Sequence, residues 1–167
     1  LHSFPTRSSS DLGATSPAAI AGSVVQAVAE VLAGLIYVNA LAPGHPAIFG
    51  TWPFVSDLRT GAMSGGSAEQ SLLTAACGQI ANHYGLVGGS PASMADSKMP
   101  DIQSGYEKGI TTVTAGLAGT NLIYEAAGMH ASLMGFCMEG LIIDNDILGQ
   151  SLRCVREIRR ASCRERV

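Results

Sequence analysis

The sequence predicts an α/β fold, namely part of a (βα)8 TIM-type barrel with about three to four βα units. Apolar segments at 46–50, 86–89 and 121–125 recur about every 35 to 40 residues, with polar loops and helical segments between them. This is the rhythm of repeated βαβ units and therefore of a parallel sheet. Short strands followed by polar loops favour a barrel, with an open doubly wound sheet as the alternative. A whole barrel needs about 250 residues, so the 167 residues of this chain predict an internal piece of a larger domain.

Four helices are expected around these strands. Ser16 is a favoured N-cap and Pro17 a favoured first helical residue, so they predict the first helix start. Ser67 with Glu69 and Gln70 in the following turn predicts the second, and Pro100 with Asp101 the third. The expected ranges are 17–41, 67–84, 100–118 and 141–158.

The two ends differ in composition from the middle of the chain. Residues 1–12, LHSFPTRSSSDL, and residues 161–167, ASCRERV, resemble translated sequencing-adapter peptides. We therefore expect both to be non-native terminal segments, and we expect residues 13–160 to form the partial barrel domain. Ordinary disordered termini are the alternative, and they leave the predicted fold unchanged.

Composition limits the kinds of partner. The chain is 47% hydrophobic and 14% charged, with a net charge of −3, so it predicts buried structure without a sustained basic surface. Binding to nucleic acid or to an anionic membrane is not expected. The apolar stretch 17–42 contains Gln26, Glu30 and Asn39 and lacks basic flanks, so we expect a buried helix and not a membrane span. Without a secretory signal, the predicted location is the cytoplasm.

The usual signatures of metal, phosphate and nucleophile chemistry are missing from the sequence. Its cysteines form no Cys-x-x-Cys pair and have no histidine at ligand spacing, so we expect reduced thiols and no metal ligands. The glycine clusters match neither a P-loop nor a dinucleotide fingerprint, and no Gly-x-Ser-x-Gly or His-Glu-x-x-His motif occurs. The four cysteines are Cys77, Cys137, Cys154 and Cys163.

The loop after the first strand, 51–66, holds candidate substrate-binding residues, because barrel enzymes carry their chemistry in such loops. Thr51, Asp57 and Arg59 are the candidates, with Arg59 suited to an anionic group such as a carboxylate. Pairing between Asp57 and Arg59 is the alternative. Trp52 and Phe54 offer ring faces to a methylammonium, or else pack under the barrel rim.

The loop after the second strand is the densest polar cluster in the chain. It offers Lys98 as a candidate catalytic residue and four candidate substrate-binding residues around it. Asp101 and its neighbours also fit plain roles in the first turns of the third helix, where the helix dipole favours an acidic residue. The four binding candidates are Asp96, Asp101, Gln103 and Tyr106.

The segment after the third strand adds Glu125 and His130. An inward carboxylate at a barrel mouth is costly unless it is functional or paired, so Glu125 is a candidate catalytic residue. His130 is a weaker candidate for substrate binding. His45 and His83 fall at helix ends, where capping or solvent contact is the usual role.

Several strings in a fixed order resemble the trimethylamine methyltransferase family, and the resemblance covers residues 13–158. They include GATSPA at 13–18, SDLRTGA at 56–62, ADSKMPDIQSGYEKG at 95–109, LAGTNLIYEAAGM at 117–129 and IIDNDILG at 142–149. The resemblance implies a barrel enzyme that moves a methyl group from a methylated amine to Co(I) of a separate corrinoid protein. No cofactor would be bound directly, because the corrinoid (cobalamin) comes with that partner. A homo-oligomer is expected for the full-length protein.

The resemblance also bears on the substrate. Trimethylamine requires activation, which the family attributes to pyrrolysine, whereas a quaternary ammonium such as glycine betaine leaves as a neutral amine. The pyrrolysine position falls near Lys98–Met99–Pro100, and Met99 would then mark a member without it. A quaternary amine is the expected substrate. The alternatives are a Schiff-base lyase or aldolase that uses Lys98, and a non-catalytic amine-binding barrel.

Overall fold

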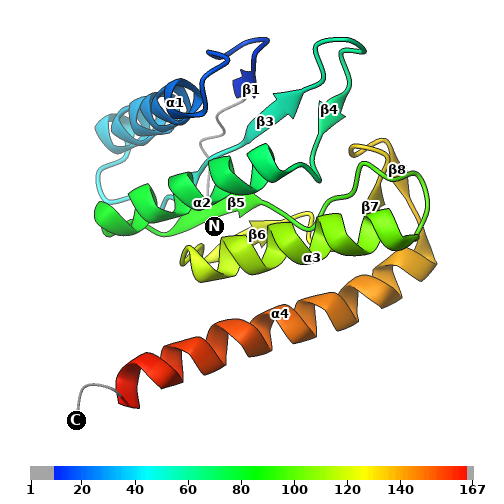
Figure 1. Ribbon diagram of the computed structural model, residues 1–167. Helices are drawn as coiled ribbons and strands as arrows, with labels where there is room; N and C mark the ends of the chain where they lie inside the picture. Colours follow the sequence, from blue (N-terminus) through cyan, green and yellow to red (C-terminus); the bar gives the residue numbers. More distant parts are fainter. Residues whose placement is uncertain (1–9, 165–167) are drawn as a thin grey trace.

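The computed structural model describes residues 10–164, and Figure 1 shows their arrangement. The helices are α1 (Ile20–Leu41), α2 (Ala68–His83), α3 (Ile102–Leu117) and α4 (Met138–Arg164). The strands are β1 (Ser10–Leu12), β2 (Phe49–Gly50), β3 (Pro53–Ser56), β4 (Met63–Ser64), β5 (Gly88–Pro91), β6 (Leu122–Tyr124), β7 (Met129–His130) and β8 (Gly135–Phe136).

The predicted parallel sheet is confirmed. It has the order β2-β5-β6, and each pair is parallel, with Phe49 opposite Gly88 and Gly89 opposite Leu122. These strands overlap the three predicted segments, although each begins one to three residues later than expected, at Phe49, Gly88 and Leu122. Within residues 10–164 the sheet does not close on itself, so the structure is a mixed α/β fold without a closed barrel.

Two smaller pieces of sheet lie where the sequence predicted only loops. In one, β3 pairs in parallel with β1 and antiparallel with β4, and in the other β7 and β8 form a hairpin. Strands of two to four residues are too short for an apolar–polar alternation to stand out in the sequence. Strand β1 falls in the predicted non-native segment 1–12, of which residues 1–9 lie outside the described part. The domain boundaries stay predictions.

The helix starts follow local capping chemistry. Ser67 caps α2 as predicted, since its side chain accepts a hydrogen bond from Gln70 N. Helix α1 begins at Ile20 after an uncapped Ala19, so the predicted cap at Ser16 is wrong. The Ser16 hydroxyl instead bonds the Ser23 hydroxyl at 2.6 Å, and its backbone N–H donates to Asp11 O.

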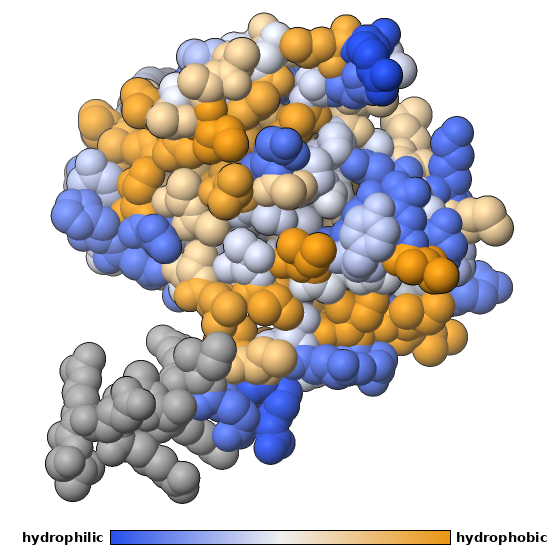
Figure 2. Space-filling model, in the orientation of Figure 1, coloured by the Kyte–Doolittle hydropathy of each residue, from blue (hydrophilic) through white to orange (hydrophobic). Residues whose placement is uncertain are grey.

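Helix α1 buries only one of its faces. Val24, Ala27 and Val31 pack against α2 and β2, together with Leu73 and Phe49. The opposite face is apolar and exposed, as Figure 2 shows, with side chains that include Val25, Ile36, Tyr37 and Leu41. The prediction of a buried helix is therefore confirmed for one face of α1 and wrong for the other. Helix α1 is long and apolar enough to cross a membrane, but length and composition are weak evidence, since core helices pass the same test.

Candidate functional site

The carboxyl ends of β2, β5 and β6 lie at one edge of the sheet, and the backbone is strained in the segments that follow β5 and β6. Among the described residues, every non-glycine residue with positive φ lies there: Ser93 (64°), Glu125 (57°), Ala131 (51°), Ser132 (55°) and Leu133 (73°). Such conformations cost on the order of 1–3 kcal/mol each and gather at functional sites. This edge is therefore the candidate site.

An aromatic pair spans this edge. The rings of Trp52, just after β2, and Tyr124, the last residue of β6, stack with centroids 5.4 Å apart and planes at 18°. Phe54 meets Trp52 edge to face at 5.6 Å. The rings meet across the central strand because Gly89 has no side chain there: a Cβ at Gly89 would lie 2.0 Å from Tyr124 Oη. Glu125 follows directly and is exposed.

Thr51 lies behind this edge, on the side facing α2. Its hydroxyl contacts the Ser90 hydroxyl at 2.8 Å and donates to Gly89 O at 3.3 Å, so it ties β2 to β5. Nearby Cys77 is buried, and burial raises the pKa of its thiol to about 11. The predicted binding residue Thr51 therefore has its hydroxyl committed to the sheet.

Asp96 joins three segments of the edge. Its carboxylate accepts hydrogen bonds from Ser64 Oγ at 2.5 Å, Gly65 N at 2.8 Å and Ser132 Oγ at 3.0 Å. Its backbone N–H donates to Glu107 Oε2 at 2.8 Å. Asp96 thus fastens β4 and the strained β7–β8 turn to the loop after β5.

Asp57 and Arg59 pair with each other at the turn between β3 and β4. Arg59 Nε lies 3.5 Å from Asp57 Oδ1, and the Arg59 side chain is 90% exposed. The backbone N–H of Arg59 also donates to Asp57 and, as the largest cause, holds the pKa of that carboxyl below its usual value. The pairing that the sequence offered as the alternative is present.

The remaining candidates from the loop after β5 occupy the start of α3. Asp101 caps the helix, accepting from Ser104 N at 2.9 Å, and this bond is the largest cause of its lowered pKa. Gln103 donates to Glu107 Oε1 at 2.8 Å, whereas Tyr106 is exposed. Lys98 is also exposed, so it lacks the burial that would favour a Schiff-base amine.

A buried charged cluster lies behind the edge and was missed by the sequence reasoning. Lys108 Nζ of α3 lies 2.5 Å from Asp144 Oδ2 of α4 and 3.4 Å from His130 Nε2. Burial and then the Lys108 charge lower the pKa of His130, whose side chain is in the interior. The sequence carried little signal for it, because a buried helix face is normally apolar, whereas the buried stripe of α3 is mostly polar and Ile102 and Ile110 are exposed. The buried stripe consists of Ser104, Glu107, Lys108, Thr111, Thr112 and Ala115.

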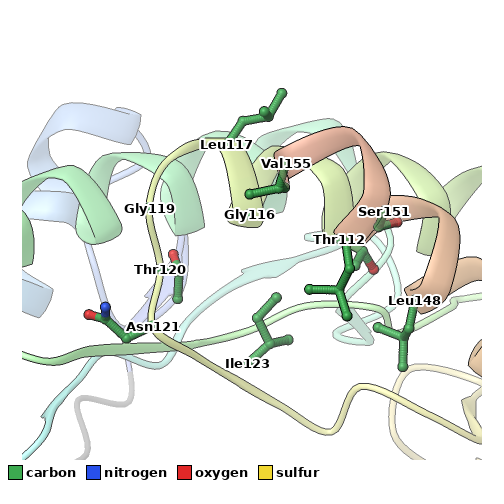
Figure 3. Close-up of a pocket in the computed structure, with 11 residues that line it drawn as sticks. Thr112, Gly116, Leu117, Gly119, Thr120, Asn121, Ile123, Leu148, Ser151 and Val155 are labelled. Atoms are coloured by element: carbon green, nitrogen blue, oxygen red, sulfur yellow. The ribbon is translucent and has the colours of Figure 1, made fainter. Parts of the chain in front are cut away.

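One cavity lies elsewhere in the structure. It has a volume of about 610 Å³ between α3, the segment leading into β6, and α4, and Figure 3 shows Thr112, Ile123, Leu148 and Val155 around it. A smaller one of about 350 Å³ lies between α1 and α2. Neither cavity is lined by a predicted site residue. In the described part of the chain, no three His, Cys, Asp or Glu side chains gather as metal ligands would.

A parallel α/β sheet with strained, polar segments at its carboxyl edge is the arrangement of an enzyme domain, in which ligands bind at that edge. The family model described as trimethylamine methyltransferase matches residues 8–164. The chain belongs to this family of methyltransferase enzymes.

Curated relatives agree with this family. The chain is 41% identical over 146 residues to a trimethylamine methyltransferase of Methanosarcina thermophila and 38% identical over 144 residues to a glycine betaine methyltransferase of Desulfitobacterium hafniense. A proline betaine:corrinoid methyltransferase of Eubacterium limosum is 31% identical over 144 residues. These matches cover 86–87% of the chain but 30% of each relative. The chain thus spans about a third of their length.

Proposed function

We propose that this chain is part of a methyltransferase that moves a methyl group from a methylated amine to a corrinoid carried by a partner protein. Family membership supports the reaction class, and the names of the relatives include trimethylamine, glycine betaine and proline betaine. The name of one relative includes the corrinoid acceptor. A cytoplasmic location and a homo-oligomeric full-length enzyme belong to the same proposal.

The aromatic pair at the carboxyl edge carries the proposal. Ring faces of Trp and Tyr attract a quaternary ammonium, and the attraction is worth roughly 0.5–2 kcal/mol, depending on how far the cation is desolvated. Trp52 and Tyr124 bring two such rings together at one place, and the exposed Glu125 follows Tyr124 directly in the chain. A methylated cation is therefore the ligand that this edge suits best.

The chemistry asks little of the protein beyond binding and orientation. The corrinoid supplies Co(I), whose electron pair takes the methyl carbon while the C–N bonding pair stays on nitrogen. A quaternary ammonium then leaves as a neutral tertiary amine and needs no proton. In this proposal the rings and Glu125 hold the cation with one methyl group toward the opening, and Lys98 lies at the rim on the neighbouring loop.

Met99 favours a quaternary donor over trimethylamine. Met99 is 64% exposed in the loop after β5. Its thioether side chain stands near the position where pyrrolysine-containing members are expected to carry pyrrolysine. Without pyrrolysine, trimethylamine is not activated for methyl transfer. A betaine needs no such activation, because it leaves as a neutral amine.

Methyl transfer by the full-length protein tests this function. Cob(I)alamin would be incubated with the enzyme and with glycine betaine, proline betaine or trimethylamine, and methylcobalamin would be followed by its absorbance. We expect turnover with a betaine and little with trimethylamine. Turnover confined to trimethylamine would reject the quaternary donor, and no methylation from any of the three would reject the function.

We propose further that the sheet is one arc of a (βα)8 barrel in the full-length protein. Strand β6 has a neighbour on only one side among the described strands, and the 610 Å³ cavity lies beside it, between α3 and α4. Apolar side chains gather along this junction in Figure 2. The next strand of the barrel would cover this edge. A full-length structure with a parallel strand beside β6 is expected, and an uncovered or antiparallel edge would contradict it.

A further inference from the structure

The ion pair between Lys108 and Asp144 is almost completely shielded from solvent, with side chains 0% and 1% exposed. Removing two charges from water costs several kcal/mol per ion, and apolar residues of similar size often give equal or greater stability. The contribution of this pair to stability is therefore a weak explanation for it. Its other contacts indicate a second role.

Asp144 also holds the backbone that follows β6. Its Oδ2 accepts the N–H of Gly128 at 2.6 Å, while Gly128 O accepts the N–H of Cys137 at 3.2 Å. Gly128 has φ +80°, and the Phe136 ring occupies the place of its missing side chain, since a Cβ there would lie 2.2 Å from Phe136 Cε2. Residue 128 is thus fixed at its N–H, at its carbonyl and at its Cα.

The fixed residue lies three positions after Glu125 and four after Tyr124. Between them the chain makes the left-handed step at Glu125, φ 57°, which is costly for a residue with a side chain. Such a conformation persists only when the surroundings hold the chain on both sides of it. Pairing of β6 with β5 holds one side, and the bond from Gly128 to Asp144 holds the other.

Lys108 makes this anchor possible. An uncompensated charge in the interior is costly, whereas a carboxylate that keeps its charge is a strong acceptor for a backbone N–H. The ammonium at 2.5 Å supplies the opposite charge, and His130 Nε2 is its second neighbour, at 3.4 Å. Gly140 leaves room for the imidazole, because a Cβ there would lie 2.4 Å from His130 Nε2.

We propose that Lys108 and Asp144 are positioning residues that fix the segment 125–128 and so keep Tyr124 against Trp52 and Glu125 beside it. This inference rests on the proposed function, since it explains the ion pair by its effect on the affinity of the edge for a methylated ammonium. Neither residue touches the substrate. Loss of the anchor should weaken amine binding without unfolding the domain.

The test uses the full-length protein and two sets of replacements. Lys108→Met combined with Asp144→Leu replaces the pair by apolar side chains and removes the acceptor for Gly128, whereas Asp144→Asn keeps an oxygen for it. Replacement of the exposed α4 pair, Arg153→Met with Glu157→Leu, is the matched control. Amine affinity is measured by calorimetric titration with glycine betaine, proline betaine and trimethylamine. Protection of the Gly128 N–H is measured by amide hydrogen exchange.

In the double variant we expect a cooperative thermal transition, loss of Gly128 protection and amine affinity about tenfold weaker. Asp144→Asn and the α4 control should keep both the protection and, within about threefold, the affinity. A folded double variant with wild-type affinity would overturn the inference. If the double variant does not fold, the Asp144→Asn variant tests the inference. Tenfold weaker amine affinity in that variant, with the Gly128 N–H still protected from exchange, would overturn the inference.

Failure of the proposed function gives a different result. A wild-type protein that binds none of the three amines would reject that function. The exchange of Gly128 in the same variants would still test the anchor, because unchanged protection after removal of Asp144 would reject its role by itself.

Discussion

Single residues decide the shape of the candidate site, and Gly89 is the clearest case. The Tyr124 ring lies over Gly89, so Gly89→Ala must push the ring off the sheet and break its stack with Trp52. We expect amine affinity in the full-length protein to fall about tenfold, within the range of a cation–π contact. Calorimetric titration with glycine betaine measures it. Gly105→Ala, where a Cβ has open space, is the matched control and should leave the affinity unchanged.

His130 predicts a pH dependence of stability. Its pKa is lowered in the folded protein, so below about pH 6.5 the unfolded chain binds more protons than the folded one. Stability should therefore fall as the pH drops from about 7 toward 5. Urea unfolding at several pH values should show a smaller decline in His130→Gln than in the wild type. An unchanged decline in that variant, with exposed His83→Gln as the control, would contradict the assignment.

At the scale of elements, helix α2 and its cap were readable from the sequence because both are local. Ser67 bonds a backbone N–H three residues away. The predicted cap at Ser16 failed because α1 begins only at Ile20, and the Ser16 hydroxyl bonds Ser23, seven residues along the chain. The β7–β8 hairpin could not be predicted, since its strands have two residues each and its turn is held by Asp96 from a distant loop.

The cap of α2 gives a prediction at this scale. Ser67→Ala removes the acceptor for Gln70 N and should lower the free energy of unfolding by about 1 kcal/mol. Chemical denaturation of the full-length protein measures it. Ser67→Asp keeps an acceptor and should retain most of the stability, and equal losses in both variants would show that the cap is not the cause.

At the scale of the whole molecule, the parallel sheet and the family were both predicted from the sequence. The use of the site residues was predicted only in part, since the pairing of Asp57 with Arg59 and the helix-start role of Asp101 were offered as alternatives. Strand spacing and ordered motifs report the chain's topology, but whether a polar residue faces ligand or protein depends on tertiary contacts. The role of Asp96 in fastening three segments and the buried pair of Lys108 and Asp144 went unrecognised.

In the proposed function, the edge formed by Trp52 and Tyr124 binds a methylated cation. Titration of the full-length protein with glycine betaine and with 3,3-dimethylbutanoate, its uncharged-carbon isostere, tests this most directly, because the two ligands differ only in the positive charge. We expect the betaine to bind about tenfold more tightly, and we expect Trp52→Leu to abolish this preference. Equal affinity for the two ligands, or a preference that survives Trp52→Leu, would contradict it.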